Sequence, residues 1–185
     1  MTKGEIRIAV REKIAAFTSV AAAEKSTAIR RHIIRDPAWK SANVVALFAS
    51  QSSEADLDPL WSDIGGKRVA YPRVSGDSIQ FIEVSAVHDL KVARWNLREP
   101  DASQIRRISP LEIDLILVPG TAFTAKGERL GRGGGFYDRL LAHPEFPAKK
   151  IGVCFDVQIF PEIPIEPHDR AVDHVITESG IVRAT

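Results

Sequence analysis

Hydrophobic positions at the start of the chain recur at the spacing of an α-helix. One stripe of apolar residues, three or four positions apart, runs through residues 3–17, with mostly polar or small residues between its members. The stripe consists of Ile6, Val10, Ile14 and Phe17. This pattern predicts an amphipathic helix, and Lys3 and Arg7 lie beside its apolar stripe, at the border of the buried face.

Three later segments also have helical patterns. They cover residues 24–35, 54–64 and 135–143. The first is expected to end before Pro37, because a residue that precedes proline disfavours helical geometry.

Between these segments, apolar residues gather in short continuous runs. The runs cover residues 43–49, 67–72, 114–119, 150–155 and 172–177. Such runs are typical of strands that are covered on both faces, and strands that alternate with helices favour a mainly parallel sheet. We therefore expect an α/β protein with three α/β/α layers.

Two segments depart from this pattern. Residues 78–84 alternate between apolar and polar side chains, which predicts an antiparallel addition to the sheet. Residues 95–110 are polar and contain two prolines, which predicts a loop that crosses the surface.

Length and charge limit the number of domains and the kinds of partner that we expect. The 185 residues are enough for one hydrophobic core, so we expect a single domain over residues 1–185. With 25 Lys and Arg against 24 Asp and Glu, the chain has no excess of positive charge that would indicate a nucleic-acid partner. No run approaches the roughly 20 apolar residues that span a bilayer, and the amino terminus lacks the pattern of a secretory signal. We expect a soluble cytoplasmic protein without a membrane or obligate protein partner.

The single cysteine, Cys154, excludes an internal disulfide and a cysteine cluster for zinc. It lies in an apolar run, which favours a role in core packing over a reactive thiol.

The segment PGTAFTAKGERLGRGGGFYDRLL, which follows the run at 114–119, carries most of the candidate chemistry. Six of the twelve glycines are in it. Glycines allow successive backbone N–H groups to turn toward one anion, and the planar guanidinium groups of Arg129 and Arg132 match phosphate oxygens. Asp138 follows, and a carboxylate beside bound phosphates is a typical magnesium ligand. The segment matches neither the P-loop nor the dinucleotide-binding pattern, so by composition alone a flexible structural turn stays an alternative.

The same string resembles the signature of 5-formyltetrahydrofolate cyclo-ligases, P-G-x-A-F-D-x-x-G-x-R-L-G-x-G-x-G-[YF]-Y-D. Other parts of the chain resemble that family in the expected order. They are the Lys3 and Arg7 pair on the first helix, FASQSSEAD with Glu54, YPR at 71–73, WNLREP at 95–100 and PHDRAVDHVIT at 167–177. The resemblance thus covers nearly the whole chain.

The resemblance implies a reaction and its cofactors, ATP and Mg²⁺. 5-Formyltetrahydrofolate is closed to 5,10-methenyltetrahydrofolate while ATP becomes ADP and phosphate. Phosphorylation turns the amide-like formyl oxygen into a good leaving group, and the neighbouring nitrogen then attacks. Because phosphoryl transfer depends mainly on positioning and charge neutralisation, cations, backbone amides and a metal are the expected parts.

Site roles follow from the motif positions. For ATP binding we expect Lys3, Arg7, Arg129, Leu130, Gly131, Arg132, Gly133, Gly134, Gly135, Phe136 and Tyr137. For the reduced folate we expect Glu54, Phe136, Tyr137 and Trp95, since a carboxylate accepts hydrogen bonds from pterin N–H groups and aromatic rings stack on flat ligands. Catalytic roles are expected for Arg132 and Tyr137, and magnesium coordination for Asp138 and Asp169.

One position departs from the family pattern. Thr124 stands where the signature has aspartate, which removes a carboxylate from the loop, although a threonine can still form local hydrogen bonds. Two other functions stay open: a sugar-phosphate isomerase on a related α/β scaffold, which needs no ATP, and a non-catalytic nucleotide-binding module.

Overall fold

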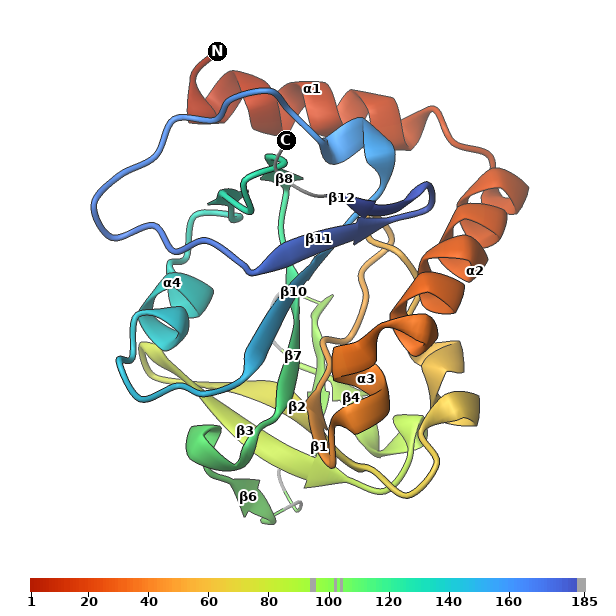
Figure 1. The fold of residues 1–185 in the computed structure, drawn as a ribbon, viewed down its shortest axis with the longest axis vertical. Coiled ribbons are helices and arrows are strands. Elements are labelled where there is room, and N and C mark those ends of the chain that lie inside the picture. Colours follow the sequence, from red (N-terminus) through yellow and green to blue (C-terminus); the bar gives the residue numbers. More distant parts are fainter. Residues whose placement is uncertain (94–95, 102, 104, 183–185) are drawn as a thin grey trace.

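A computed structural model describes residues 1–93, 96–101, 103 and 105–182, and within them the largest element is an eight-stranded sheet (Figure 1). Its strands, in chain order, are β1 (Val44–Ala46), β2 (Arg68–Ser75), β3 (Ser78–Val84), β6 (Arg107–Ile108), β7 (Leu115–Pro119), β10 (Lys149–Val153), β11 (His174–Thr177) and β12 (Gly180–Val182). Across the sheet they are ordered β12-β11-β10-β7-β1-β2-β3-β6. The central pairs are parallel, and β3, β6 and β12 pair antiparallel at the two sides. The mainly parallel sheet and the antiparallel strand at 78–84 are therefore confirmed.

The helices begin at polar caps. They are α1 (Lys3–Ala15), α2 (Ser19–Arg35), α3 (Pro37–Ser41) and α4 (Phe136–Leu141). Thr2 and Glu5 form a reciprocal capping box at the start of α1, where the Thr2 hydroxyl accepts from the Glu5 N–H at 3.2 Å. The Thr18 hydroxyl caps α2, so this helix begins well before the predicted residue 24 and ends at Arg35 as predicted.

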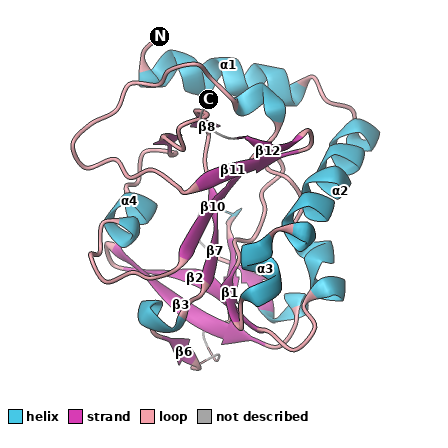
Figure 2. Ribbon diagram, viewed as in Figure 1, coloured by secondary structure: helices cyan, strands magenta, loops and turns pink. Residues whose placement is uncertain are grey.

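Hydrophobic side chains cover both faces of the sheet, because successive residues of each strand point to opposite sides. Val45 packs in one core with Ile33 of α2 and Trp39 of α3, whereas Ala46 packs in the other with Leu141 of α4. Figure 2 shows α2 and α3 next to each other and α4 away from both. The sheet therefore lies between two helical layers.

Several predicted boundaries are wrong. Residues 54–64 contain a 3₁₀ turn at Asp58–Asp63 and no α-helix, and the run 43–49 forms only the short β1. The predicted loop at 95–110 contains β5 (Arg98–Pro100), which pairs with β4 (Leu90–Val92), and the strand β6. These short strands follow tertiary pairing and have no clear pattern of their own. The helix α3 was missed by the sequence analysis.

The sheet order brings two loops together. Strand β1 pairs with β2 on one side and with β7 on the other, so the chain winds in both directions from the boundary between β1 and β7. At such a switch point the loops that follow the two strands diverge and leave a crevice at their carboxyl ends. Here those loops are residues 47–57 and 120–135, which contain Glu54 and the glycine-rich segment. Among the helices of the described residues, none is both long and apolar enough to cross a membrane.

Residues 120–130 form a small hairpin from β8 (Ala122–Phe123) and β9 (Arg129–Leu130), which is held against the chain before β11. Gly127 has φ +82°, and its N–H and C=O groups bond Thr124 and Val172. A Cβ atom at this position would lie 2.2 Å from the Val172 carbonyl oxygen.

We expect Gly127→Ala to destabilise the protein by about 3 kcal/mol, because strain at positive φ adds to a backbone clash. Thermal or urea unfolding measures this loss. Gly66→Ala is the matched control, since a Cβ atom there meets nothing within 4 Å. Equal stability of the two variants would contradict the expected clash.

Candidate active site

A cavity of ≈ 520 Å³ lies at the crevice between the loops that follow β1 and β7. Its wall comes from these loops, from β2, β3 and β5, and from α4. The lining residues include Phe48, Gln51, Glu54, Val74, Ile79, Arg98, Glu99, Arg129, Gly131, Arg132, Gly134, Gly135, Phe136, Tyr137 and Asp138. Most of the predicted residues of the glycine-rich segment and Glu54 thus line one space.

Arg129 and Asp138 form a buried ion pair in the wall of this cavity. Their Nη2 and Oδ1 atoms are 2.6 Å apart, and the side chains are 3% and 13% exposed. Arg129 also donates to the Pro119 carbonyl and lies over the ring of Tyr137, while its buried Nε–H has no hydrogen-bond partner among the described residues. The pair fixes the loop that follows β7 against α4.

Arg132 joins the two loops of the crevice. Its exposed guanidinium group donates to Glu54 at 2.8 Å and to the Ser53 hydroxyl at 3.2 Å, and it also bonds Gln51. Glu54 is only 11% exposed and accepts a further bond from the Gln51 N–H. A predicted phosphate-binding cation therefore touches the predicted folate-binding carboxylate.

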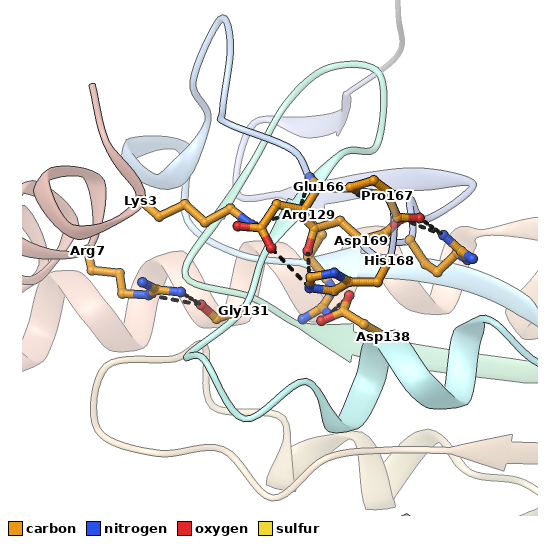
Figure 3. Close-up of polar contacts among 10 residues, drawn as sticks. Lys3, Arg7, Arg129, Gly131, Asp138, Glu166, Pro167, His168 and Asp169 are labelled. Atoms are coloured by element: carbon orange, nitrogen blue, oxygen red, sulfur yellow. Dashed lines mark hydrogen bonds and ion pairs between the residues drawn. The ribbon is translucent and has the colours of Figure 1, made fainter.

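Two cations of α1 bind different segments, Arg7 the loop that follows β7 and Lys3 the chain before β11 (Figure 3). Lys3 Nζ lies 2.8 Å from Asp169 and 3.2 Å from Glu166. Arg7 donates through Nε and Nη2 to the Gly131 carbonyl, at 3.1 and 3.0 Å. Both side chains are half-buried at the border of the apolar stripe, as the helical pattern predicted.

Burial, hydrogen bonds and nearby charges shift the pKa values of two site residues. Burial alone would raise the pKa of Asp169, but hydrogen bonds from Lys3 and from the Glu166 N–H outweigh it and hold that pKa below its usual value. Burial, and next the charge of Glu54, raise the pKa of Tyr137. Asp169 is therefore a carboxylate and Tyr137 a neutral hydrogen-bond donor at neutral pH.

The glycines bend the loop between Arg132 and α4. Gly133 and Gly135 have φ of +108° and +66°, a region that other residues rarely adopt, and Gly135 immediately precedes α4. Phe136 packs on Gly134, and the Arg139 guanidinium lies 5.0 Å from the centre of the Phe136 ring. The α4 helix has six residues and is shorter than the predicted 135–143.

Leu130 and Thr124 contribute to the scaffold. The Leu130 side chain packs beneath α1 with Ile6 and Val10, and its carbonyl accepts from the Thr121 N–H. Thr124 is buried, and its hydroxyl donates to Glu128 at 2.8 Å across the hairpin turn. Position 124 is therefore engaged in the turn and does not line the cavity.

The donor set suits magnesium in ligand type. Asp138 lines the cavity, with the Oδ1 atom bound to Arg129, while Asp169 bonds Lys3. Within the described residues no group of three or more His, Cys, Asp or Glu side chains converges on one point. Magnesium needs only one or two carboxylates when phosphate oxygens and waters complete its shell, so the type of these ligands suits it. Of the two aspartates, only Asp138 lines the cavity.

Sequence reasoning missed part of the cavity wall. Arg98 lines it and forms a two-pronged ion pair with Asp58 at 2.6 and 3.0 Å, and Glu99 accepts from the Val74 N–H. The charged residues Arg98 and Glu99 in WNLREP were the only sequence signal for this part of the wall. Their partners, Asp58 and Val74, are far away in sequence. Trp95, which was predicted to contact folate, lies outside the described residues.

Comparison with known proteins shows the family to which the chain belongs. A model of the 5-formyltetrahydrofolate cyclo-ligase family matches residues 1–178. The chain belongs to this family. A mouse 5-formyltetrahydrofolate cyclo-ligase is 27% identical, with 96% of this chain and 94% of the relative covered. The relative named 5-formyltetrahydrofolate cyclo-ligase from Escherichia coli K12 is 30% identical, over 93% of this chain and 98% of its own length.

Solved structures support membership of the cyclo-ligase family. The NMR structure of 5,10-methenyltetrahydrofolate synthetase from Aquifex aeolicus superposes with a TM-score of 0.86 and 32% identity, over 99% of this chain and 93% of that one. A synthetase of the same name from Mycoplasma pneumoniae, at 23% identity and a TM-score of 0.77, shares the fold. The α/β fold predicted from the sequence is the fold of these enzymes.

Proposed function

We propose that this family member converts 5-formyltetrahydrofolate to 5,10-methenyltetrahydrofolate, with ATP as phosphoryl donor and magnesium as the required ion. The contact between Arg132 and Glu54 carries the proposal, because it joins a candidate phosphate ligand to a candidate pterin ligand at 2.8 Å. Phosphoryl transfer to the formyl oxygen requires that the two substrates meet at such a point.

The larger cavity suits the folate. Glu54 accepts hydrogen bonds from pterin N–H groups, and the rings of Phe136 and Tyr137 provide flat apolar surface beside it. The neutral hydroxyl of Tyr137 donates a hydrogen bond to the reacting oxygen, since burial keeps it protonated.

Arg132 orients and neutralises the transferred phosphoryl group. The neighbouring nitrogen, which lies outside the pterin ring, attacks the formyl carbon and loses its proton, and the formyl oxygen then leaves as phosphate. Asp138 and Asp169 would hold magnesium, which supplies positive charge to the phosphate oxygens. The ion pair with Arg129 holds Asp138 in place.

The decisive assay mixes the protein with 5-formyltetrahydrofolate and follows the absorbance of the methenyl product. We expect product only when both ATP and Mg²⁺ are present, and excess EDTA to stop its formation until Mg²⁺ is restored. An enzyme that turns over a sugar phosphate without ATP would support the isomerase alternative. Binding of ATP without methenyl product would support a nucleotide-binding module instead.

A further inference from the structure

A second, smaller cavity of ≈ 280 Å³ lies between α1 and the two loops of the crevice. It shares Glu54, Gly120 and Arg132 with the larger cavity, so the Arg132–Glu54 pair stands between the two spaces. The complete lining is Arg7, Val10, Arg11, Ile14, Ser53, Glu54, Gly120, Thr121, Arg132 and Gln158. Its volume is just below the range for whole small molecules, so it suits part of a ligand.

The charges of the two cavities differ. Three arginines and one glutamate line the smaller cavity, and that glutamate is already paired with Arg132. The larger cavity has three arginines against three carboxylates, together with a larger apolar wall. An excess of guanidinium groups in a confined space attracts anions, so the smaller cavity is the better site for a polyphosphate.

Three cations of α1 lie along the helix on this side, at positions 3, 7 and 11. Lys3 is neutralised by Asp169 and Glu166, and Arg7 donates both Nε and Nη2 to the Gly131 carbonyl (Figure 3). Arg11 is one helical turn beyond Arg7, its residue is exposed, and it has no hydrogen bond or ion pair within the described part of the chain. Of these three cations, Arg11 is therefore the one whose donors are all unused by contacts within the described residues.

Three hydrogen bonds hold Gln158, a residue that lines this cavity. Gln158 is buried and donates from Nε2 to the carbonyls of Gly120 and Thr121, each at 3.0 Å, while its Oε1 atom accepts from the Phe155 N–H at 2.9 Å. These bonds hold the turn after β7 beneath the arginines. This part of the wall therefore does not have to form when an anion enters.

We propose that Arg11, outside the Lys-x-x-x-Arg pair of the family motif, is a further phosphate-binding residue for the nucleotide, in the smaller cavity that it lines together with Arg7 and Arg132. The inference rests on the proposed function and specifies which residues bind the phosphates of the nucleotide. Phosphates that occupy this cavity approach the folate through the Arg132–Glu54 boundary.

The first test uses inorganic tripolyphosphate as the probe, measured by calorimetric titration without folate. We expect Arg11→Ala to raise the Kd about tenfold, the effect of losing one hydrogen bond to a charged group, and Arg11→Lys to restore part of the affinity. Lys13→Ala is the matched control. It removes the same charge from α1, but Lys13 does not line the cavity and instead lies over the Phe160 ring.

The second test is kinetic. Arg11→Ala should raise KM for ATP about tenfold while KM for 5-formyltetrahydrofolate changes less than twofold, since Arg11 does not line the larger cavity. Equal effects of Arg11→Ala and Lys13→Ala, or a wild-type protein that does not bind tripolyphosphate, would overturn the proposal. The titration needs no turnover, so a protein that binds tripolyphosphate through Arg11 but forms no methenyl product would refute only the proposed reaction.

Discussion

Replacement of Arg132 by alanine is expected to lower kcat/KM for methenyl formation at least about a thousandfold, the effect typical of an arginine that neutralises a transferred phosphoryl group. The free energy of unfolding should change by less than about 1 kcal/mol. The Arg132 side chain is 49% exposed, and ion pairs of such groups contribute little to stability. Steady-state kinetics and thermal unfolding of the same preparation measure both quantities.

Two further variants test whether Arg132 acts directly on the substrates. Arg132→Lys keeps the charge without the planar fork and should recover only part of the rate. Arg139→Ala removes another exposed arginine near the same loop, which bonds the carbonyls of Asp77 and Gly134, and it should cost less than tenfold. If Arg132→Ala and Arg139→Ala lower kcat/KM equally, Arg132 acts through the loop and not on the substrates.

The second large effect concerns Asp138, whose replacement by asparagine should abolish turnover and also destabilise the fold by about 3 kcal/mol. The substitution leaves the Arg129 guanidinium buried without its counter-charge, and Arg129 Nε already lacks a partner among the described residues. Urea unfolding measures the stability, and the methenyl assay at low temperature, where the variant stays folded, measures the rate.

A double variant separates the two roles of the pair. Arg129→Met with Asp138→Leu replaces both charges by apolar side chains, and a buried ion pair can be replaced in this way with little loss of stability. We expect unfolding close to that of the unchanged protein, with no turnover. Recovery of activity in this double variant would show that neither charge takes part in the reaction.

The comparison of Arg132 with Asp138 also shows what the sequence leaves undecided about the site. Both residues belong to the same motif, and both were assigned to the site from it. Burial depends on the packing of α4 against the loop that follows β7, and therefore only the structure distinguishes the exposed Arg132 from the buried Asp138.

For α1 as well, the sequence predicts where side chains lie on the helix but not which residues they contact. Helical spacing placed Lys3 and Arg7 correctly at the border of the buried face, but it contained no information on their partners. Asp169 and Gly131 lie far along the chain, and only the tertiary fold brings them to α1. The greater availability of Arg11 follows from those long-range contacts.

The sequence by itself determined the α/β class, the mainly parallel sheet, the antiparallel strand β3 and the family, because periodicity and local motifs depend on nearby residues. It did not determine the strands β5 and β6 or the helix α3, whose short segments follow tertiary pairing. The tertiary structure alone decided which charges are paired and how the Arg132–Glu54 contact stands between two cavities. Those properties depend on the loops that follow β1 and β7, which the sheet order brings together at the carboxyl ends of the strands. No local sequence pattern predicts this contact between distant loops.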